Sequence, residues 1–185
     1  MKESAVKDKI VDVATRLFYN QGYNLTGINQ VIKEADIARA SLYNHFESKT
    51  DLLLAYLEKF NDDWFAGLDA FLEPISDPKK KVLALFDYRM TSQQKLGFGG
   101  CASIKINDEV GGDDARITEI VRRNKHTLKS RILKLVLAVK HKQILSTAAL
   151  ADMIYLLMEG GVTSASIFKS KHDLENGKMI AAQLL

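Results

Sequence analysis

A short segment that begins at Arg39 gathers side chains that hydrogen-bond well to a polyanion. Arg39 can pair with guanine through two hydrogen bonds, and Asn44 can pair with adenine. The hydroxyls of Ser41 and Tyr43 can donate to phosphate, and Ala40 is small enough to contact a thymine methyl group. These residue types predict one element that enters the major groove of double-stranded DNA.

Apolar spacing around this segment predicts the helices that position it. Leu42 and Phe46 lie four residues apart, so both would face the protein interior from one side of a short helix. Another short helix is expected from Thr26, a residue type that often precedes a helix, to about Asp36. An earlier helix has apolar residues at steps of four, three and four: Val6, Ile10, Val13 and Leu17. Two short helices joined by a tight turn and packed on a third predict a helix-turn-helix.

Two residues of this segment have an alternative role. Arg39 is interpreted as a residue that reads a base, with phosphate contact or solvation as the alternative. His45 is interpreted as packing and hydrogen-bonding at the end of its helix, with base contact as the alternative. The recognition of sequence would then depend mainly on Arg39 and Asn44.

The composition is that of an ordinary globular protein and excludes several classes of function. The chain has 185 residues, of which 46% are hydrophobic and 26% are charged, and its formal net charge is +3. The single cysteine, Cys101, excludes an intramolecular disulfide, and the four histidines lack zinc-site spacing, so we expect no metal and no cofactor. No signal peptide and no window of about 18 uncharged apolar residues is found. We therefore expect a cytoplasmic protein without a membrane partner.

Sparse helix breakers and the lack of strand-like alternation predict an all-α fold of about nine helices. Ser48 and Asp51 have the spacing of a capping box that opens a long helix, and Asp77 before Pro78 opens another. The stretch from Gly97 to Gly100 is interpreted as a helix breaker, since a phosphate loop would end in Lys-Ser or Lys-Thr. We expect a helix-turn-helix domain at residues 1–47 and a second helical domain at residues 48–185.

Residues 150–168 are apolar or small almost throughout, with Asp152 and Glu159 as the charged residues. A helix that is apolar all round is buried on more than one side. Small side chains would let another helix approach closely at Gly160, Gly161, Ala165 and Ser166. We therefore expect a symmetric homodimer, with a fully buried central helix in a monomer as the alternative.

Positive charge is concentrated in one later part of the chain. Residues 115–142 carry nine lysines and arginines against one glutamate. This basic stretch could contact DNA or an anionic ligand, but a solvated helix face is the interpretation that we favour.

Several short strings point to a known family. They are Gly22-Tyr23, Thr26-Gly27-Ile28, Glu34-Ala35 and the run from Ser41 to Lys49, Ser-Leu-Tyr-Asn-His-Phe-Glu-Ser-Lys. Together they resemble the TetR family of one-component bacterial transcriptional regulators, most densely over residues 6–57. Weaker resemblance at Gly100-Cys101, Glu109 and Glu159-Gly160-Gly161 is similar to the branch of that family with a glycine-cysteine pair in the sensor domain.

The resemblance implies a homodimeric repressor that binds a palindromic operator and is released by a small-molecule effector. It implies that residues 48–185 bind the ligand and dimerise. It also implies that Thr26 holds phosphate with its hydroxyl and the start of its helix, and that Tyr43 and Lys49 contact mainly backbone phosphates. The family usually has glycine in the turn where this chain has Asp36, so we expect Asp36 in a left-handed backbone conformation, which aspartate tolerates.

For the sensor domain, polarisable apolar residues and a few charged ones are the candidates to line a ligand cavity. They are Trp64, Phe86, Arg89, Met90, Cys101, Lys105, Tyr155 and Glu159. Cys101 is interpreted as a small core residue, and a redox-responsive regulator that uses its thiol is the alternative. A further alternative is a helical small-molecule-binding protein or enzyme with a vestigial DNA-binding head. The sequence contains no catalytic motif, so no enzyme is expected.

Overall fold

The computed structural model describes residues 2–110, 112, 114–140 and 144–185, with side chains from residue 5 onward. Within these residues the regular structure is entirely α-helical, which confirms the expected all-α fold. Lys142, at the end of the basic stretch, lies outside the described residues. None of the described helices is both long enough and apolar enough to cross a membrane.

The chain divides into two compact units. The head unit comprises residues 1–64 and 102–122, and the body unit comprises residues 65–101 and 123–185. Two helices, α4 (Lys49–Leu72) and α7 (Ala115–Leu137), begin in the head unit and end in the body unit. The domain boundary that the sequence places between residues 47 and 48 stays a prediction.

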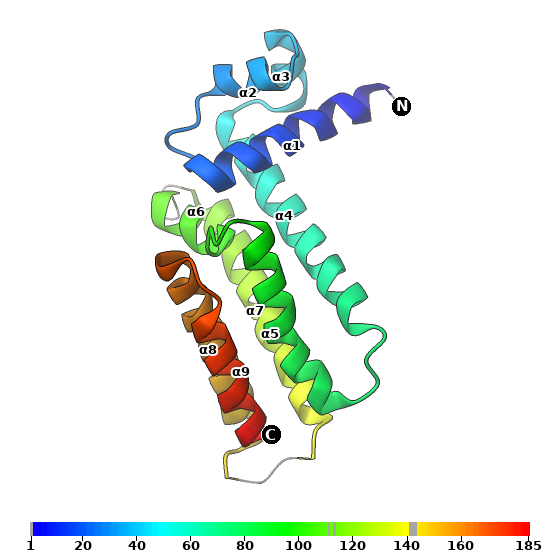
Figure 1. The fold of residues 1–185 in the computed structure, drawn as a ribbon. Helices are drawn as coiled ribbons and strands as arrows, with labels where there is room; N and C mark the ends of the chain where they lie inside the picture. Colours follow the sequence, from blue (N-terminus) through cyan, green and yellow to red (C-terminus); the bar gives the residue numbers. More distant parts are fainter. Residues whose placement is uncertain (1, 111, 113, 141–143) are drawn as a thin grey trace. The chain divides into compact units, whose positions relative to one another are not determined.

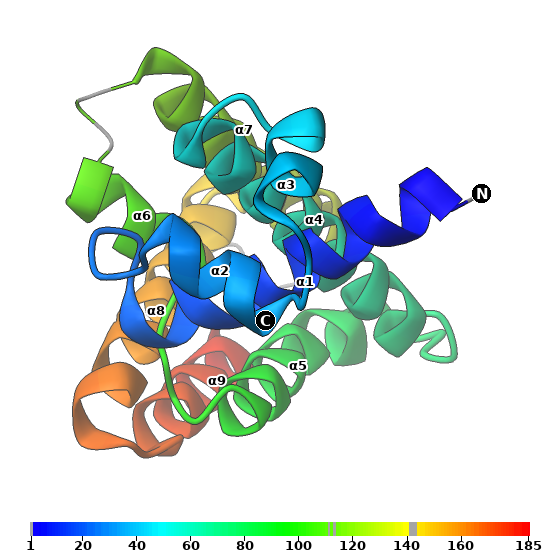
Figure 2. The same ribbon diagram turned by 90° about the horizontal axis from the view of Figure 1, so that it is seen from above.

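The head unit is built on α1 (Lys2–Gln21), which packs against the shorter helices α2 (Ile28–Glu34) and α3 (Arg39–His45) (Figures 1 and 2). Its core includes Leu42 and Phe46, which are 0% and 5% exposed, so the predicted inward face of the short helix is confirmed. Phe18 of α1 meets Tyr56 of α4 edge to face, with ring centroids 5.7 Å apart. The remaining head helix is α6 (Ala102–Val110).

Local hydrogen bonds explain where the head helices begin and turn. The hydroxyl of Ser48 accepts the N–H of Asp51 at 3.1 Å at the start of α4, so the predicted helix opening is confirmed. Asp36 has a φ of 48°, which confirms the left-handed conformation expected in the turn. The prediction that Thr26 caps α2 is wrong, because the N-cap residue is Gly27 and the helix begins at Ile28.

In the body unit, α5 (Pro78–Lys95), α8 (Thr147–Phe168) and α9 (His172–Leu184) lie side by side (Figures 1 and 2). The carboxylate of Asp77 accepts the N–H of Lys80 at 2.7 Å and Pro78 is in the first turn, as the sequence predicts for the start of α5. Helix α5 ends at Lys95, and Gly97 just beyond its C-cap residue has a φ of +59°, which confirms the glycine stretch as a helix breaker.

One side of the α8–α9 pair is strongly apolar and open to solvent. Large apolar side chains are between 39% and 71% exposed there: Met153, Leu156, Ile167, Phe168, Met179 and Ile180. Gly161 lies on the covered side, where an added Cβ would come within 2.8 Å of Leu174 of α9. The alternative of a central helix that one chain buries on all sides is therefore wrong.

Candidate nucleic-acid interface and buried charge cluster

Helix α3 presents one polar face to solvent and one apolar face to the head core. Arg39, Ala40, Tyr43 and Asn44 are exposed, whereas Leu42 is completely buried. The exposed positions are spaced by one, three and one residues, so on a helix they share one side. Four of the residues that the sequence selects for DNA contact are thus gathered on a single accessible surface, which we call the α3 face.

Arg39 is held in place by two neighbours. Its Nη1 donates a hydrogen bond to Oδ1 of Asn29 at 3.1 Å, and its guanidinium carbon lies 5.5 Å from the ring centroid of Tyr43. These contacts restrict the arginine before any ligand binds and so lower the entropy lost on binding. Sequence reasoning missed Asn29, because nothing local marks an exposed asparagine of α2 as the partner of an arginine ten residues later.

The other predicted DNA-contact residues lie at the rim of the α3 face. Ser41 and His45 are half-buried, and His45 is the last residue of α3. The ammonium of Lys49 lies 4.0 Å from the ring centroid of Tyr23. Burial lowers the pKa of Lys49, and the negative charge of Glu109 opposes that shift. Lys49 is therefore a restrained cation at the start of α4.

Thr26 differs from its neighbours because it is fully buried. Its hydroxyl donates to the carbonyl of Gly22 at 2.6 Å and lies 3.0 Å from the Nε2 donor of Gln21. Both bonds tie the end of α1 to the loop before α2. In this conformation the hydroxyl is directed to protein groups, and the first free N–H groups of α2 belong to residues after Gly27.

Helix α6 is fastened to the head unit by two charged side chains. A carboxylate oxygen of Glu109 accepts the backbone N–H of Asn24 at 2.8 Å. The ammonium of Lys105 donates to the backbone carbonyl of Tyr19 and lies 4.8 Å from the centroid of the Tyr19 ring. Lys105, a candidate for the ligand cavity by sequence, is thus used inside the head unit.

A cluster of charged side chains is buried in the body unit. Nη2 of Arg89 donates to one carboxylate oxygen of Glu159 at 3.1 Å, and the ammonium of Lys125 donates to the other. The same ammonium lies 3.4 Å from Sγ of Cys101. These four residues, from α5, the loop before α6, α7 and α8, form what we call the body cluster.

Electrostatics in the body cluster keep Lys125 protonated. Burial acts to lower the pKa of Lys125, but its electrostatic interactions with Cys101 and Glu159 and its hydrogen bond to Glu159 outweigh that effect, so the pKa lies above its ordinary value. The pKa of the nearby Tyr155 phenol is also raised, first by burial and then by the charge of Glu159. The charge of Glu159 therefore favours the protonated forms of both Lys125 and Tyr155.

The structure distributes the predicted sensor residues between the two units. Arg89, Cys101 and Glu159 come together in the body cluster, and Tyr155 is half-buried on α8. Phe86 is fully buried, and an added Cβ at Gly177 of α9 would lie 3.1 Å from its ring, so Phe86 serves the core. Met90 is half-buried, whereas Trp64 belongs to the head unit. Cys101 is half-buried rather than a core residue.

Sequence reasoning missed the residue that joins the body cluster. Lys125 was included in the basic stretch, for which a solvated face was the favoured interpretation. Its partners lie 24 and 34 residues away along the chain, so no helical spacing indicates the contact.

The head unit contains a helix-turn-helix with an exposed recognition face, an arrangement that defines a class of DNA-binding proteins. Comparison with known proteins agrees with this class. Residues 10–56 match the model of "Bacterial regulatory proteins, tetR family". The transcriptional repressor DhaR of Mycobacterium sp. is 24% identical over 180 residues, which is 95% of this chain and 89% of DhaR. The transcriptional regulator LmrA of Bacillus subtilis is 35% identical over 79 residues, but that match spans 42% of each chain.

A solved structure resembles nearly the whole chain. A TetR transcriptional regulator from Chloroflexus aurantiacus has a TM-score of 0.86 and 23% sequence identity, and the match covers 98% of this chain and 94% of that one. This likeness shows a shared fold. Residues 10–56 thus belong to the TetR family of bacterial regulatory proteins, and the chain as a whole is similar in fold to a solved member of that family. The chain's membership of the branch with a glycine-cysteine pair stays a prediction.

Proposed function

We propose that the protein is a homodimeric transcriptional repressor that binds a palindromic operator and leaves it when a small molecule binds the body unit. The observation that carries the proposal is the α3 face, where Arg39, Tyr43 and Asn44 are exposed above the buried Leu42. Base edges are read by Arg39 and Asn44, and phosphate is held by Tyr43, Ser41 and Lys49. The protein acts in the cytoplasm, by binding and without catalysis.

Release follows from a shift between conformations. Helices α4 and α7 each extend from the head unit into the body unit, so a conformational preference imposed on the body affects both units. A ligand changes operator binding only if it prefers one of the two conformations. The DNA-bound dimer needs its two α3 faces about 34–36 Å apart, one turn of the duplex.

Selection from random DNA tests this proposal. The purified protein is incubated with a pool of random duplexes at stated salt concentrations, and the retained sequences are determined. A palindrome with two half-sites is expected. The salt concentration is varied from roughly 50 to 200 mM. If no motif is enriched at any of these concentrations, the proposal is contradicted for the protein without an added ligand.

The Arg39→Ala variant tests the role of the α3 face. We expect it to weaken binding to the selected operator by about 1–3 kcal/mol, and to weaken binding to random DNA much less. Lys80→Ala, which removes an exposed cation from the body unit, is the matched control and should leave both affinities unchanged. An equal loss on operator and random DNA would show that Arg39 contacts phosphate.

A second candidate is a regulator that responds to thiol-reactive compounds. The contact of 3.4 Å between the Lys125 ammonium and Sγ of Cys101 favours it, because a neighbouring cation stabilises a thiolate. N-ethylmaleimide, to which a thiol adds across the double bond, should then lower operator affinity of the natural chain and leave that of Cys101→Ser unchanged. If both proteins respond alike, or neither responds, this candidate is rejected.

A further inference from the structure

A cavity of about 650 Å³ lies in the body unit between the end of α4, the start of α5 and the end of α7. None of the sensor residues selected from the sequence lines it. Its lining is mainly apolar and consists of Leu68, Leu72, Pro78, Leu85, Leu135 and Ala138, with charged side chains around them. Leu68 and Leu85 are each 1% exposed, so the floor of the cavity is part of the folded core.

The charges around the cavity are unequal. Its cations are Lys81, Arg131 and Lys134, and its anions are Asp69 and Glu73. Arg131 already pairs with Asp69 through Nη1 and Oδ1, which cancels one charge of each sign. Within the described part of the chain, Lys81 and Lys134 take part in no ion pair. Apart from that pair, the charged residues of the lining are therefore two lysines and one carboxylate.

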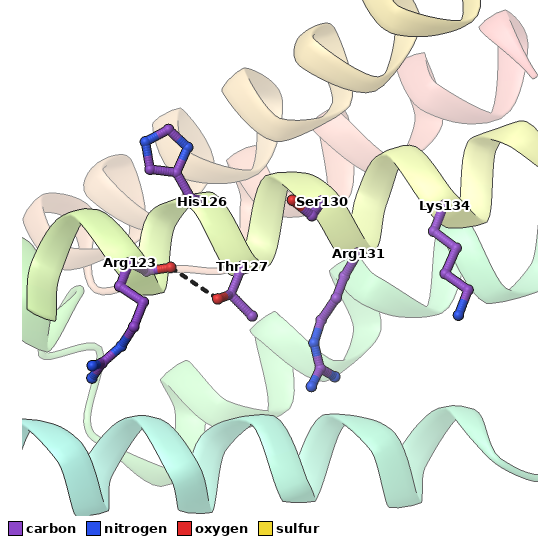
Figure 3. A pocket seen from close by; sticks show the side chains of 6 residues that line it. All are labelled: Arg123, His126, Thr127, Ser130, Arg131 and Lys134. Carbon is purple, nitrogen blue, oxygen red and sulfur yellow. Dashed lines mark hydrogen bonds between the residues drawn. The ribbon is translucent and has the colours of Figure 1, made fainter.

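Helix α7 extends the positive surface beyond the cavity. A shallower pocket of about 380 Å³ shares Arg131 and Lys134 and is also lined by Arg123 and His126 (Figure 3). Figure 3 shows Arg123 and Arg131 extending to the same side of the helix. Residues 123–140 contain no aspartate or glutamate, so every charged side chain that this part of α7 contributes to the two pockets is basic.

Arg131 is placed to connect these two pockets. Its guanidinium carbon lies 4.6 Å from the ring centroid of Phe65, on the last part of α4, and its side chain is about one-third exposed. Stacking on an aromatic ring together with pairing to Asp69 restricts its motion. Arg131 is thus a restrained cation in the lining of both pockets.

We propose that this cavity binds an amphipathic organic anion, with the anionic group between Lys81 and Lys134 and an apolar body against Leu68 and Leu85. Its volume lies within the range of roughly 300–1,000 Å³ that is typical for small-molecule sites. A cationic amphiphile is disfavoured because Asp69 is already paired, which leaves Glu73 against two lysines. The claim that the bound anion acts as an effector rests on the proposed function. The claim that the cavity binds the anion does not.

Calorimetric titration of the full-length protein with decanoate, below its micelle concentration, tests the site. Decylammonium, which has the same chain and the opposite charge, is the comparison probe. We expect decanoate to bind at least about tenfold more tightly than decylammonium, as one charge-assisted hydrogen bond would provide. Binding that is equal for the two probes, or no binding of decanoate, would overturn the proposal.

Paired variants locate the binding. Lys81→Gln with Lys134→Gln should weaken decanoate binding at least about tenfold, whereas Lys80→Gln with Lys140→Gln removes two exposed cations outside the lining and should not. Ala138→Trp should fill the cavity and prevent binding. Ala70→Trp, at an exposed position of α4 outside the lining, should bind decanoate normally.

These variants also separate this proposal from the proposed function. Decanoate affinity that is the same in all four variants would place binding elsewhere and overturn the site, because both charge and space at the cavity would then be irrelevant. The titrations contain no DNA, so they test the cavity independently of operator binding. If the protein binds decanoate at this cavity but selects no operator, only the proposed function is refuted. A selected operator with no decanoate binding would refute the site alone.

Discussion

Glu159 holds two cations in the body unit and has little access to water. Its side chain is 13% exposed, and those of Arg89 and Lys125 are 9% and 21% exposed. Taking three charges out of water costs several kcal/mol for each, and their mutual attraction offsets much of that cost. The cluster therefore adds little net stability while intact, but the loss of Glu159 would leave two cations without their shared carboxylate.

We predict that Glu159→Gln lowers the free energy of unfolding by about 3 kcal/mol. Glu175→Gln is the matched control, because Glu175 also pairs with a lysine but is 43% exposed, and it should cost less than about 1 kcal/mol. Urea denaturation of both variants at equal protein concentration measures the difference. Equal costs would show that the body cluster contributes no more than a surface ion pair.

The raised pKa of Lys125 gives the same cluster a dependence on pH. A group whose pKa is higher in the folded state stabilises that state fully below its unfolded value, 10.5 for lysine. That contribution is lost as the pH rises through the folded value. The natural chain should therefore lose stability above a pH of about 10.5 more steeply than Lys125→Met, when urea midpoints are compared across that range.

At the scale of elements, the features predicted correctly are those that depend on neighbouring residues. Ser48 opens α4 and Asp77 opens α5 because a cap needs a side chain within three residues of a free N–H. Asp36 adopts its left-handed conformation for an equally local reason. The exposed side of α3 follows from helical spacing around Leu42, so most of the candidate DNA interface could be predicted from the sequence.

Apart from Thr26, whose hydroxyl bonds to a carbonyl four residues earlier, the incorrect or missing predictions concern contacts between distant residues. Thr26 has the residue type of a helix cap, but its hydroxyl is bonded to the end of α1, which leaves Gly27 to precede the helix. Lys105 bonds to Tyr19, 86 residues away, and Lys125 bonds to Glu159, 34 residues away. A periodic pattern identifies the inner side of a helix but does not identify the helix that will cover it.

For the whole molecule, the apolar side of α8 and α9 is the surface that a single chain leaves exposed to solvent. Leu156, Ile167 and Phe168 are 65%, 67% and 71% exposed. Gly160 has no atom within 4 Å of the position that a Cβ would take, so another helix has room to approach there. Apolar surface of this kind is the usual mark of a protein interface, and two copies can cover it symmetrically.

We predict that Leu156→Lys prevents dimerisation, because a pair of symmetric lysines would be forced together in an apolar interface. Leu137→Lys is the matched control, since Leu137 is 66% exposed but lies at the end of α7. Sedimentation velocity should show a monomer for Leu156→Lys and a dimer for the control.

The monomer should also lose most of its affinity for a palindrome while keeping its affinity for one half-site, because linking two heads raises the effective concentration of the second. A dimer of unchanged stability in Leu156→Lys would place the interface on another surface, and a monomer with undiminished operator affinity would show that dimerisation is not needed for DNA recognition.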